Sequence, residues 1–391
     1  MPPTNSPNNL KTTPLNIAII GSGISGLLAA RILRPQHNVT IYERHSHAVE
    51  TGAAINIGPN GIVILDSVGF DRRRARTLTY NKAGAITTDT VIDYEREFGA
   101  DWLFFHRSDL HNEPLRLATA PSAELGVEGV PTKVRFGAKA VGVDVEAGEV
   151  RLARGDVVRA DLVVVNRQRA AADGIKSTLR ESVLPCTPNS TPIPAGSSVF
   201  RFTLTRAQVH AALGHIPDKL DRTQPGCITT VLPSTPRSAG AAHSPRVWNV
   251  HRTPPLPSYI NGRTVLIGDA AHAMPPHQGQ GGTQAIEDAE PLRVCFGDHV
   301  TSGAVPALLR DFDRVRRPRA SKIQVNNVQA KGRRSAAEIH RFLRFNWTFA
   351  GIWEEVRNLE MSQAGAVGGA AAGVEAAQRG VYRLWLIQVG W

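Results

Sequence analysis

Hydrophobic residues near the N-terminus are spaced in a way that predicts a strand, a helix and a second strand. Residues 15–20 form a short, mostly apolar run that meets a glycine, which is typical of a buried strand. Residues 27–33 have a helical composition, and Pro35 helps to end that helix. Residues 39–43 are rich in β-branched and aromatic side chains. Together these segments predict a βαβ unit.

Further along the chain, the pattern predicts more strands and then helices. The additional segments with strand character are 134–143, 149–152, 162–165 and 264–268. Residues 185–257 are dense in Pro, Ser and Thr, with short β-like pieces such as 198–204, which predicts a second region of sheet and long loops. The chain is helical from Thr283 onward, and residues 304–349 form a basic helical stretch with a break expected at Pro318.

The composition is that of a globular enzyme. The chain has 391 residues, enough for two domains or one large composite domain, and 42% of them are hydrophobic, which allows a sizeable core. A formal net charge of +11 fits either a solvated basic surface or the attraction of anionic ligands such as dinucleotides. The Lys and Arg residues are scattered, and no basic stretch carries interleaved aromatic residues, so no nucleic-acid partner is expected.

The cysteine content and the lack of long apolar runs indicate in which cellular compartment the protein is expected. Cys186, Cys227 and Cys295 are odd in number and widely spaced, which argues against a disulfide framework or a zinc site. This usage favours a reducing compartment, so we expect a cytoplasmic location and no bound metal. Residues 1–14 are polar and lack the apolar core of a secretory signal, and they are interpreted as a disordered arm. No apolar run reaches transmembrane length, so stable membrane insertion is not expected.

The glycine-rich segment 21–26 lies between the first predicted strand and the predicted helix. In such a loop Gly21 permits the tight turn, Gly23 lets the backbone approach a pyrophosphate, and Gly26 lets helix and strand pack closely. The helix N-terminus then offers free N–H groups to the phosphates. Glu43 closes the second strand, where its carboxylate accepts hydrogen bonds from a ribose diol and repels a 2′-phosphate. The tightly held dinucleotide is therefore predicted to be FAD or NAD rather than NADP.

A second motif, at residues 266–282, separates these two cofactors. The segment reads Gly-Asp-Ala-Ala-His from Gly268 to His272 and continues to a Gly-Gln-Gly-Gly run at 279–282. It resembles the second flavin motif of the group A flavoprotein monooxygenases, in particular the salicylate hydroxylase-like branch with its fungal secondary-metabolism members. The resemblance implies FAD as the cofactor, since an NAD-linked dehydrogenase does not explain this segment.

Each position in the second motif has a physical use. Asp269 can accept a hydrogen bond from a ribityl hydroxyl, and Gly279, Gly281 and Gly282 leave the backbone bare for the flat flavin ring. The helix that follows points its N-terminus at the flavin pyrimidine edge, where it stabilises negative charge on the reduced flavin. His272 is interpreted as a structural residue that caps the turn rather than as a catalytic one.

Three further segments are similar to the same family. Residues 52–61, with Gly52 and Ala54, resemble the small-residue loop beside the flavin ring. His-Arg-Ser-Asp-Leu at 106–110 resembles a helix start whose arginine reaches the cofactor, which carries over to Arg107; the alternative for Arg107 is a surface ion pair. Asp173 begins a segment that resembles the family's Asp-Gly motif, which is shared between flavin and nicotinamide binding.

Arg201 is the candidate for a catalytic residue on the substrate side. The strand 198–201 loosely resembles the family's aromatic-x-Arg strand at the entrance to the substrate domain. In the fungal branch that arginine orients a phenolate-like substrate or contacts the flavin. The alternative is an ordinary exposed arginine on a strand.

The resemblance also implies the fold and its domains. We expect an α/β fold in which a Rossmann-like FAD-binding domain of the glutathione-reductase type carries an inserted, shortened, β-rich substrate domain and C-terminal helices. The FAD-binding domain is predicted to be discontinuous, at 15–70, 100–182 and 260–300. Residues 71–99 and 183–259 are assigned to the substrate domain, and residues 301–391 to the C-terminal helical region.

The reaction implied by the resemblance is hydroxylation of an aromatic, phenolic or polyketide-like small molecule. In this family NADPH or NADH binds transiently and reduces the flavin, and O2 then gives a flavin C4a-hydroperoxide that transfers oxygen. No second glycine loop is needed for the transient cofactor, and none is present. Two alternatives stay open: a flavin oxidoreductase that inserts no oxygen, and a degenerate FAD-binding paralogue without activity.

The sequence departs from the family in two places. Residues 166–171 form a polar insertion between the strand 162–165 and the Asp-Gly motif, and the segment between Asp173 and Gly268 is shorter than in other members. We interpret the chain either as a divergent paralogue or as a gene model with a retained intron fragment and a lost exon. Both departures concern the substrate side more than the first glycine loop.

Overall fold

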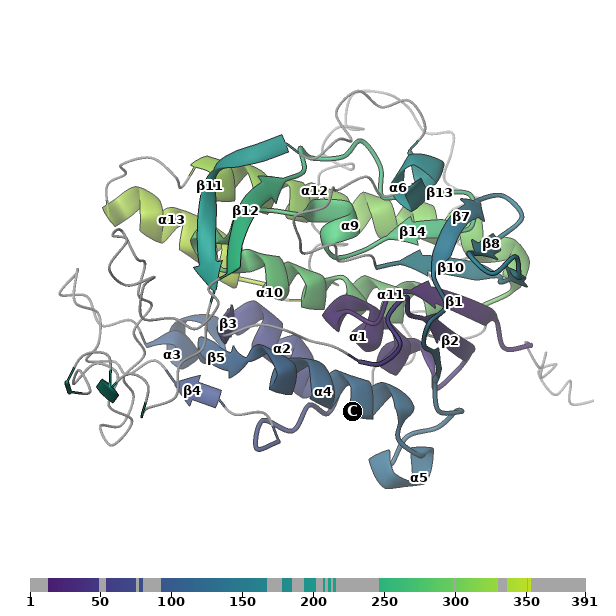
Figure 1. Ribbon diagram of the computed structural model, residues 1–391, viewed down its shortest axis with the longest axis horizontal. Coiled ribbons are helices and arrows are strands. Elements are labelled where there is room, and N and C mark those ends of the chain that lie inside the picture. Colours follow the sequence, from purple (N-terminus) through teal and green to yellow (C-terminus); the bar gives the residue numbers. More distant parts are fainter. Residues whose placement is uncertain are drawn as a thin grey trace, which may run out of the picture. The chain divides into compact units, whose positions relative to one another are not determined.

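A six-stranded sheet, here called the central sheet, lies in the right-hand half of the computed structural model as drawn in Figure 1 and has the order β13-β14-β10-β1-β2-β6. Five of its strands run parallel, and only the edge strand β13 is antiparallel to its neighbour. The strands are β1 (Asn16–Ile20), β2 (Asn38–Tyr42), β6 (Lys133–Arg135), β10 (Leu162–Val165), β13 (Ile260–Asn261) and β14 (Thr264–Leu266). The predicted α/β class with a parallel sheet is therefore confirmed.

The structure describes most of the first 349 residues. The described ranges are 13–48, 54–74, 77–79, 93–166, 178–184, 193–201, 246–297, 300–329 and 336–349, with a few isolated positions besides. Residues 1–349 make up one compact unit of the chain. The predicted disordered arm at 1–14 falls almost entirely outside the described residues.

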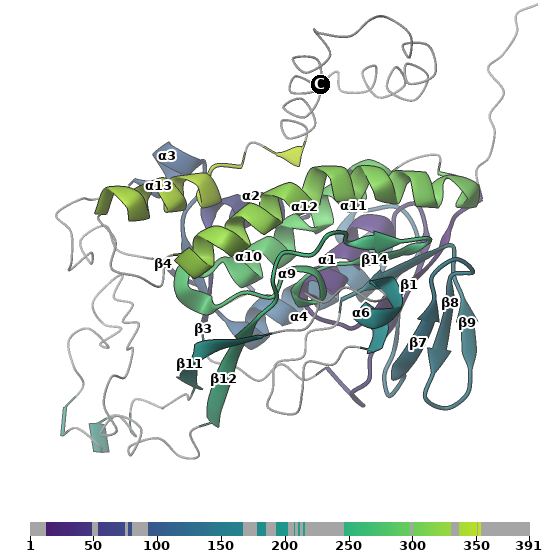
Figure 2. The same cartoon turned by 90° about the horizontal axis from the view of Figure 1, so that it is seen from above.

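The smaller sheets flank the central one (Figure 2). They are a β3-β5-β4 sheet, a β7-β8-β9 sheet and a pair formed by β11 and β12. Their bounds are β3 (Ala54–Ile57), β4 (Thr77–Thr79), β5 (Leu103–His106), β7 (Ala140–Asp144), β8 (Glu149–Leu152), β9 (Val157–Arg159), β11 (Ile193–Arg201) and β12 (Arg246–Arg252). β4 pairs with β5, so this sheet joins segments assigned to different domains, and the domain boundaries remain predictions.

Helices cover the central sheet. α1 contacts β1 and β2 and packs against α4, α10 and α11. The helices are α1 (Ile24–Leu33), α2 (Pro59–Ser67), α3 (Tyr94–Phe98), α4 (Arg107–Thr119), α5 (Ser122–Leu125), α6 (Thr178–Val183), α9 (Asp269–His272), α10 (Gln280–Glu287), α11 (Ala289–Phe296), α12 (Val305–Gln329) and α13 (Ala336–Trp347). Among the described residues, none of these helices is both long and apolar enough to cross a membrane.

The break expected at Pro318 was wrong, because α12 runs from Val305 to Gln329 without interruption. Pro318 is exposed, so the carbonyl that loses its backbone donor can be hydrated. Arg316 and Arg319 lie on the buried face of the same turn and are held there by ion pairs. Tertiary contacts on one face of the helix thus offset the unfavourable proline on the other.

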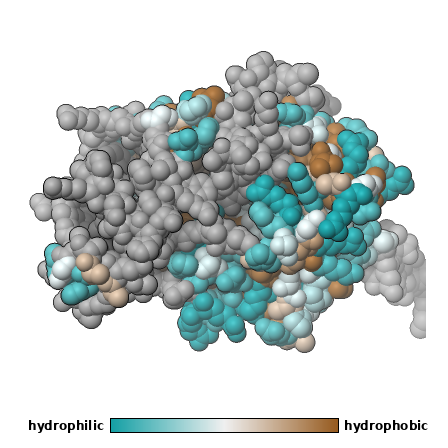
Figure 3. Space-filling model, in the orientation of Figure 1, coloured by the Kyte–Doolittle hydropathy of each residue, from teal (hydrophilic) through white to brown (hydrophobic). Residues whose placement is uncertain are grey.

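The described surface is mainly hydrophilic on the face shown in Figure 3. Hydrophobic side chains form small, separate spots there rather than one patch. Val141 and Val157, on β7 and β9, are among the exposed large hydrophobic residues. Scattered exposed valines of this kind are normal on a protein surface.

Arg34, at the C-terminal end of α1, ties the glycine-loop helix to α4. Its side chain is fully buried, and Nη1 donates to the carbonyls of Leu117, Ala118 and Ala120 while Nη2 donates to Ser122 Oγ. We expect Arg34→Met to lower the free energy of unfolding by about 2 kcal/mol or more, because the substitution leaves these buried acceptors without a hydrogen-bond donor. Denaturant titration at neutral pH measures this, and an unchanged midpoint would contradict it.

Candidate functional site

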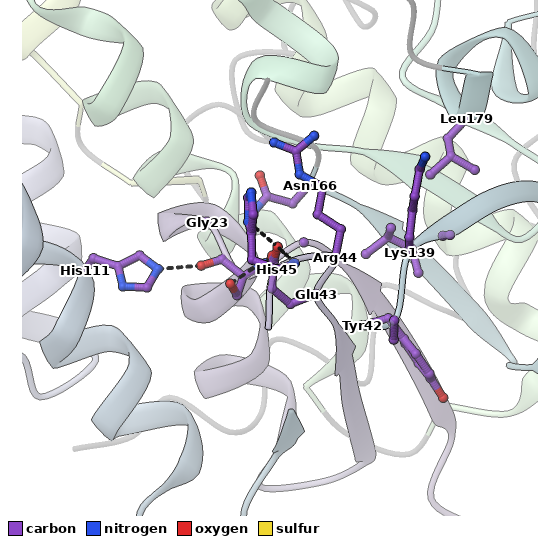
Figure 4. Close-up of a pocket in the computed structure, with 14 residues that line it drawn as sticks. Gly23, Tyr42, Glu43, Arg44, His45, His111, Lys139, Asn166 and Leu179 are labelled. Atoms are coloured by element: carbon purple, nitrogen blue, oxygen red, sulfur yellow. Dashed lines mark hydrogen bonds and ion pairs between the residues drawn. The ribbon is translucent and has the colours of Figure 1, made fainter. Parts of the chain in front are cut away.

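A pocket opens where β1, β2 and β10 end (Figure 4). Its lining includes Gly23, Glu43, Arg44, Lys139 and Asn166. In open α/β sheets, ligands bind outside the carboxyl ends of the parallel strands, and this pocket lies at that edge. The glycine loop and the acidic residue predicted for a dinucleotide therefore meet in one place.

The glycine loop makes the turn from β1 into α1. Gly21 has a positive φ of 103°, and its N–H donates to the Tyr42 carbonyl over 3.0 Å. A Cβ atom on Gly26 would collide with the Gly21 carbonyl oxygen, so a side chain has no room there. Gly23 is the N-cap of α1 and supplies no side-chain hydrogen bond, which leaves the first-turn N–H groups available to an anion. This loop fits a dinucleotide pyrophosphate.

Glu43 follows β2 and is bonded to the glycine loop itself. Its Oε2 accepts hydrogen bonds from Ser22 N at 2.9 Å and Ser22 Oγ at 3.0 Å, and its Oε1 accepts one from His45 N at 2.9 Å. Burial alone would raise the pKa of Glu43, but the hydrogen bonds from His45 and Ser22 outweigh it and hold the pKa below its ordinary value. Glu43 is therefore ionised at neutral pH and braces the loop from the wall of the pocket.

His111, on α4, completes this bracing (Figure 4). Its Nε2 lies 2.7 Å from the Ser22 carbonyl oxygen, and because a carbonyl only accepts, Nε2 is the donor. His111 is buried, as is Ser22. No periodic or motif signal in the sequence points to this contact, because it depends on α4 packing beside the loop.

Asp288 organises the second motif. Its Oδ2 accepts from Gly268 N at 2.6 Å, His272 Nε2 lies 2.9 Å from the same oxygen, and Arg316 Nε donates to Oδ1 over 2.7 Å. Burial would raise the pKa of Asp288, but His272 and Arg316 outweigh it and lower the pKa to about 2. His272 is thus bonded into the fold, in agreement with its interpretation as a structural residue.

Two arginines of α12 hold the buried acids at the C-terminal end of α10, where Glu287 is the last helical residue and Asp288 the C-cap. Arg319 pairs with Glu287 through two contacts of 3.0 Å, and Arg316 Nη1 lies 3.3 Å from Glu287 Oε2. The site predicted from the sequence did not include Glu287, Asp288, Arg316 and Arg319. A signal was present: an i,i+3 arginine pair on one helix face opposite two consecutive acids.

The glycines at 279–282 differ in what surrounds them. Gly279 has φ of +65°, and a Cβ there would collide with the Asn56 side chain on β3. A Cβ on Gly282 would lie 2.8 Å from Ile55 Cδ1, whereas one on Gly281 would meet nothing within 4 Å. Gly279 and Gly282 therefore have to be glycines for this segment to pack against β3. The space beside Gly281 is open.

Asp269 begins the short helix α9, and its backbone is held by Arg180 of α6. Arg180 Nη2 donates to the Asp269 carbonyl over 2.9 Å, and its Nε donates to the Ala270 carbonyl over 2.8 Å. The Asp269 side chain is half-buried, and its carboxylate has no hydrogen-bond partner in the part of the chain that the structure describes. It is thus available to a ligand hydroxyl.

The other predicted site residues are described in part. Ala54 opens β3 and is registered opposite His106, the residue before Arg107, which begins α4. Arg201 is the last residue of β11 and is registered opposite Arg246. Gly52 and Asp173 lie outside the described residues. Across the described ranges, no group of three or more His, Cys, Asp or Glu side chains is placed to hold a metal ion.

The parallel sheet, the glycine loop braced by an acid and the Gly-Asp turn define a dinucleotide-binding flavoprotein site. The sequence matches the family described as "FAD binding domain" over residues 14–213 and 227–327. Because these residues make up most of the chain, the protein belongs to this family.

Relatives narrow the class. The FAD-dependent monooxygenase atnJ of Arthrinium sp is 27% identical, over 81% of this chain and 84% of the relative. A salicylate hydroxylase of Pseudomonas putida is 28% identical, over 82% of this chain and 86% of the relative. The predicted class, a salicylate hydroxylase-like FAD-dependent monooxygenase with FAD as its cofactor, is confirmed.

Solved structures agree on the fold. A salicylate hydroxylase substrate complex superposes with a TM-score of 0.62 at 24% identity, covering 88% of this chain and 97% of that one. CtdE in complex with FAD and a substrate has a TM-score of 0.62 at 19% identity, covering 90% of this chain and all of that one (100%). The Rossmann-like FAD-binding architecture is therefore confirmed.

Substitution of the two predicted cofactor acids tests the site. We expect Glu43→Ala and Asp269→Ala each to lower FAD occupancy in the purified protein, because the first removes the brace of the glycine loop and the second removes the predicted acceptor for a ribityl hydroxyl. Occupancy is measured as flavin released on denaturation per mole of protein. Unchanged occupancy in both variants would refute their assigned roles.

Asp288→Asn tests the second motif through stability. We expect the free energy of unfolding to fall by roughly 3 kcal/mol at neutral pH, because Arg316 loses a buried partner. The native pKa of about 2 is below the ordinary 3.8, so Asp288 stabilises the fold fully above pH 3.8 and loses this effect as the pH falls toward 2. Denaturant midpoints across this range should converge for wild type and variant, and a constant gap would contradict the assignment.

Proposed function

We propose that the protein uses NADPH or NADH and O2 to hydroxylate an aromatic, phenolic or polyketide-like small molecule. The observation that carries the proposal is the joint presence of a braced glycine loop and a Gly-Asp turn at one sheet edge, in a chain of the FAD-binding family. Relatives named salicylate hydroxylase and hispidin-3-hydroxylase support an aromatic substrate. FAD, when bound, supplies the oxygen-activating chemistry.

The protein's own residues are proposed to bind the cofactor and to orient the substrate. Gly21, Gly23 and Gly26 are assigned to the pyrophosphate, and Glu43 is assigned to the adenosine ribose. Gly21, Gly23 and Glu43 line the pocket, and Gly26 packs against the Gly21 carbonyl oxygen behind it. The flavin side is assigned to Asp269, whose carboxylate accepts no hydrogen bond from the described residues, and to the residues Gly52, Ala54, Arg107, Asp173, Gly279, Gly281 and Gly282.

Arg201 is proposed as the residue that orients the substrate. Its support is its position at the end of β11, in the region assigned to the substrate domain. A guanidinium in such a place favours the phenolate form of a phenol, since it offers a fixed positive charge to the developing anion.

The nicotinamide cofactor is proposed to bind only transiently. The sequence holds one glycine loop of this type, and a carboxylate at Glu43 repels a 2′-phosphate in the tightly held site. A cytoplasmic location is proposed from the cysteine usage. We further propose that the partners are a small-molecule substrate and O2. No nucleic-acid partner and no stable membrane insertion are expected.

A degenerate paralogue that binds FAD without catalysis is the second candidate. Two features favour it: the polar insertion that begins at Asn166, beside the glycine loop, and the short segment between Asp173 and Gly268. A flavin oxidoreductase that inserts no oxygen is the third. All three candidates share the FAD site and differ in turnover.

Turnover with labelled oxygen separates these candidates. We expect an aromatic acid or polyketide phenol from a screen to stimulate NAD(P)H oxidation and to yield a product that carries label from 18O2. Stimulated oxidation without label would support the oxidoreductase. A yellow, FAD-loaded protein that no member of the screen stimulates would support the degenerate paralogue.

A further inference from the structure

Asn166 lies where β10 ends and is bonded to the first flavin motif. Its backbone N–H donates to the Ile20 carbonyl over 2.9 Å, and its Oδ1 accepts from Ser25 Oγ at 2.7 Å. The residue is only 3% exposed, and its Nδ2 has no hydrogen-bond partner among the described residues. A buried amide donor left unpaired is unfavourable, so this nitrogen requires a partner that the described residues do not provide.

Three glycines of the predicted flavin motifs surround this amide. A Cβ atom added to Gly23 would lie 3.0 Å from Asn166 Nδ2, and one added to Gly26 would lie 2.6 Å from it. A Cβ on Gly268 would lie 2.9 Å from Asn166 Oδ1. The amide therefore fills the space between the pyrophosphate loop and the Gly-Asp turn and contacts both halves of the cofactor site.

The same amide stands beside the N-terminus of α1. Asn166 and Gly23 line one pocket and are neighbours in Figure 4. α1 has ten residues, and its N-cap, Gly23, offers no side-chain hydrogen bond. The first-turn N–H groups and the positive end of the helix dipole favour a phosphate at this point. An anion held there lies next to the unpaired amide.

We propose that the Asn166 amide turns toward the pocket when FAD binds and donates a hydrogen bond from Nδ2 to the FAD pyrophosphate. Ser25 Oγ can donate or accept, so it stays a partner of the turned amide. The polar insertion at 166–171 thus begins with a cofactor ligand that this chain supplies from β10. The proposal rests on FAD binding and is independent of whether the enzyme hydroxylates.

The first test is the dissociation constant of FAD, measured by flavin fluorescence quenching on the full-length apoprotein. Asn166→Ala should raise it about tenfold or more, which is the effect of losing a hydrogen bond to a charged group. Asn166→Asp keeps the shape but places a negative charge beside the pyrophosphate, so it should raise the constant further. Asn38→Ala removes an exposed asparagine at the start of β2 and serves as the matched control, with no change expected.

Competition by ADP and by adenosine shows whether the phosphates are the partner. Both Asn166 variants should weaken ADP and leave adenosine unchanged. Equal weakening of ADP and adenosine would overturn the proposal in favour of an amide that only shapes the loop. Tighter FAD binding by Asn166→Ala would also overturn the proposal, because it would show that the Asn166 side chain hinders FAD binding sterically. If Asn166→Ala does not fold, the isosteric Asn166→Asp gives the ADP-to-adenosine comparison by itself.

Discussion

The buried carboxylate of Asp288 is the constraint on which the flavin side of the site depends. It accepts hydrogen bonds from the Gly268 backbone and from His272, at the two ends of α9, and from Arg316 on α12. Taking an ion pair out of water is costly, and the cost is offset only where the geometry is good and each lone pair is used. Because removal of one partner leaves another charge buried, the network tolerates little displacement. The Gly268 turn is therefore held in a fixed position.

On the adenosine side of the site, hydrogen bonds to the glycine loop play the corresponding role. Glu43 accepts from Ser22 and His45, and His111 donates to the Ser22 carbonyl, so the glycine loop is fixed from both sides. The two braces sit at the ends of β2 and β14, with β1 and β10 between them in the sheet. Asn166, at the end of β10, contacts both motifs, so the halves of the site are coupled through one side chain.

The structure also shows where part of the chain's positive charge lies. The sequence left open a solvated basic surface or the attraction of anionic ligands. Four arginines are instead buried: Arg34, Arg180, Arg316 and Arg319. They donate to helix-end carbonyls, to the Asp269 turn and to buried acids. Part of the formal excess therefore holds helices together and does not act on ligands.

The βαβ unit, the parallel sheet and the two flavin motifs could all be predicted from the amino-acid sequence. These follow from local rules: apolar runs of strand length, glycines where the backbone must turn or approach, and an acid at the end of the second strand. Tertiary structure alone decided the bracing contacts, since Glu43 to Ser22, His111 to Ser22 and Asp288 to Gly268 join positions that no short pattern connects. It also decided that α12 continues through Pro318, because ion pairs on its buried face outweigh a local preference. Local pattern fixes where a strand or turn forms, while buried polar partners depend on which elements meet.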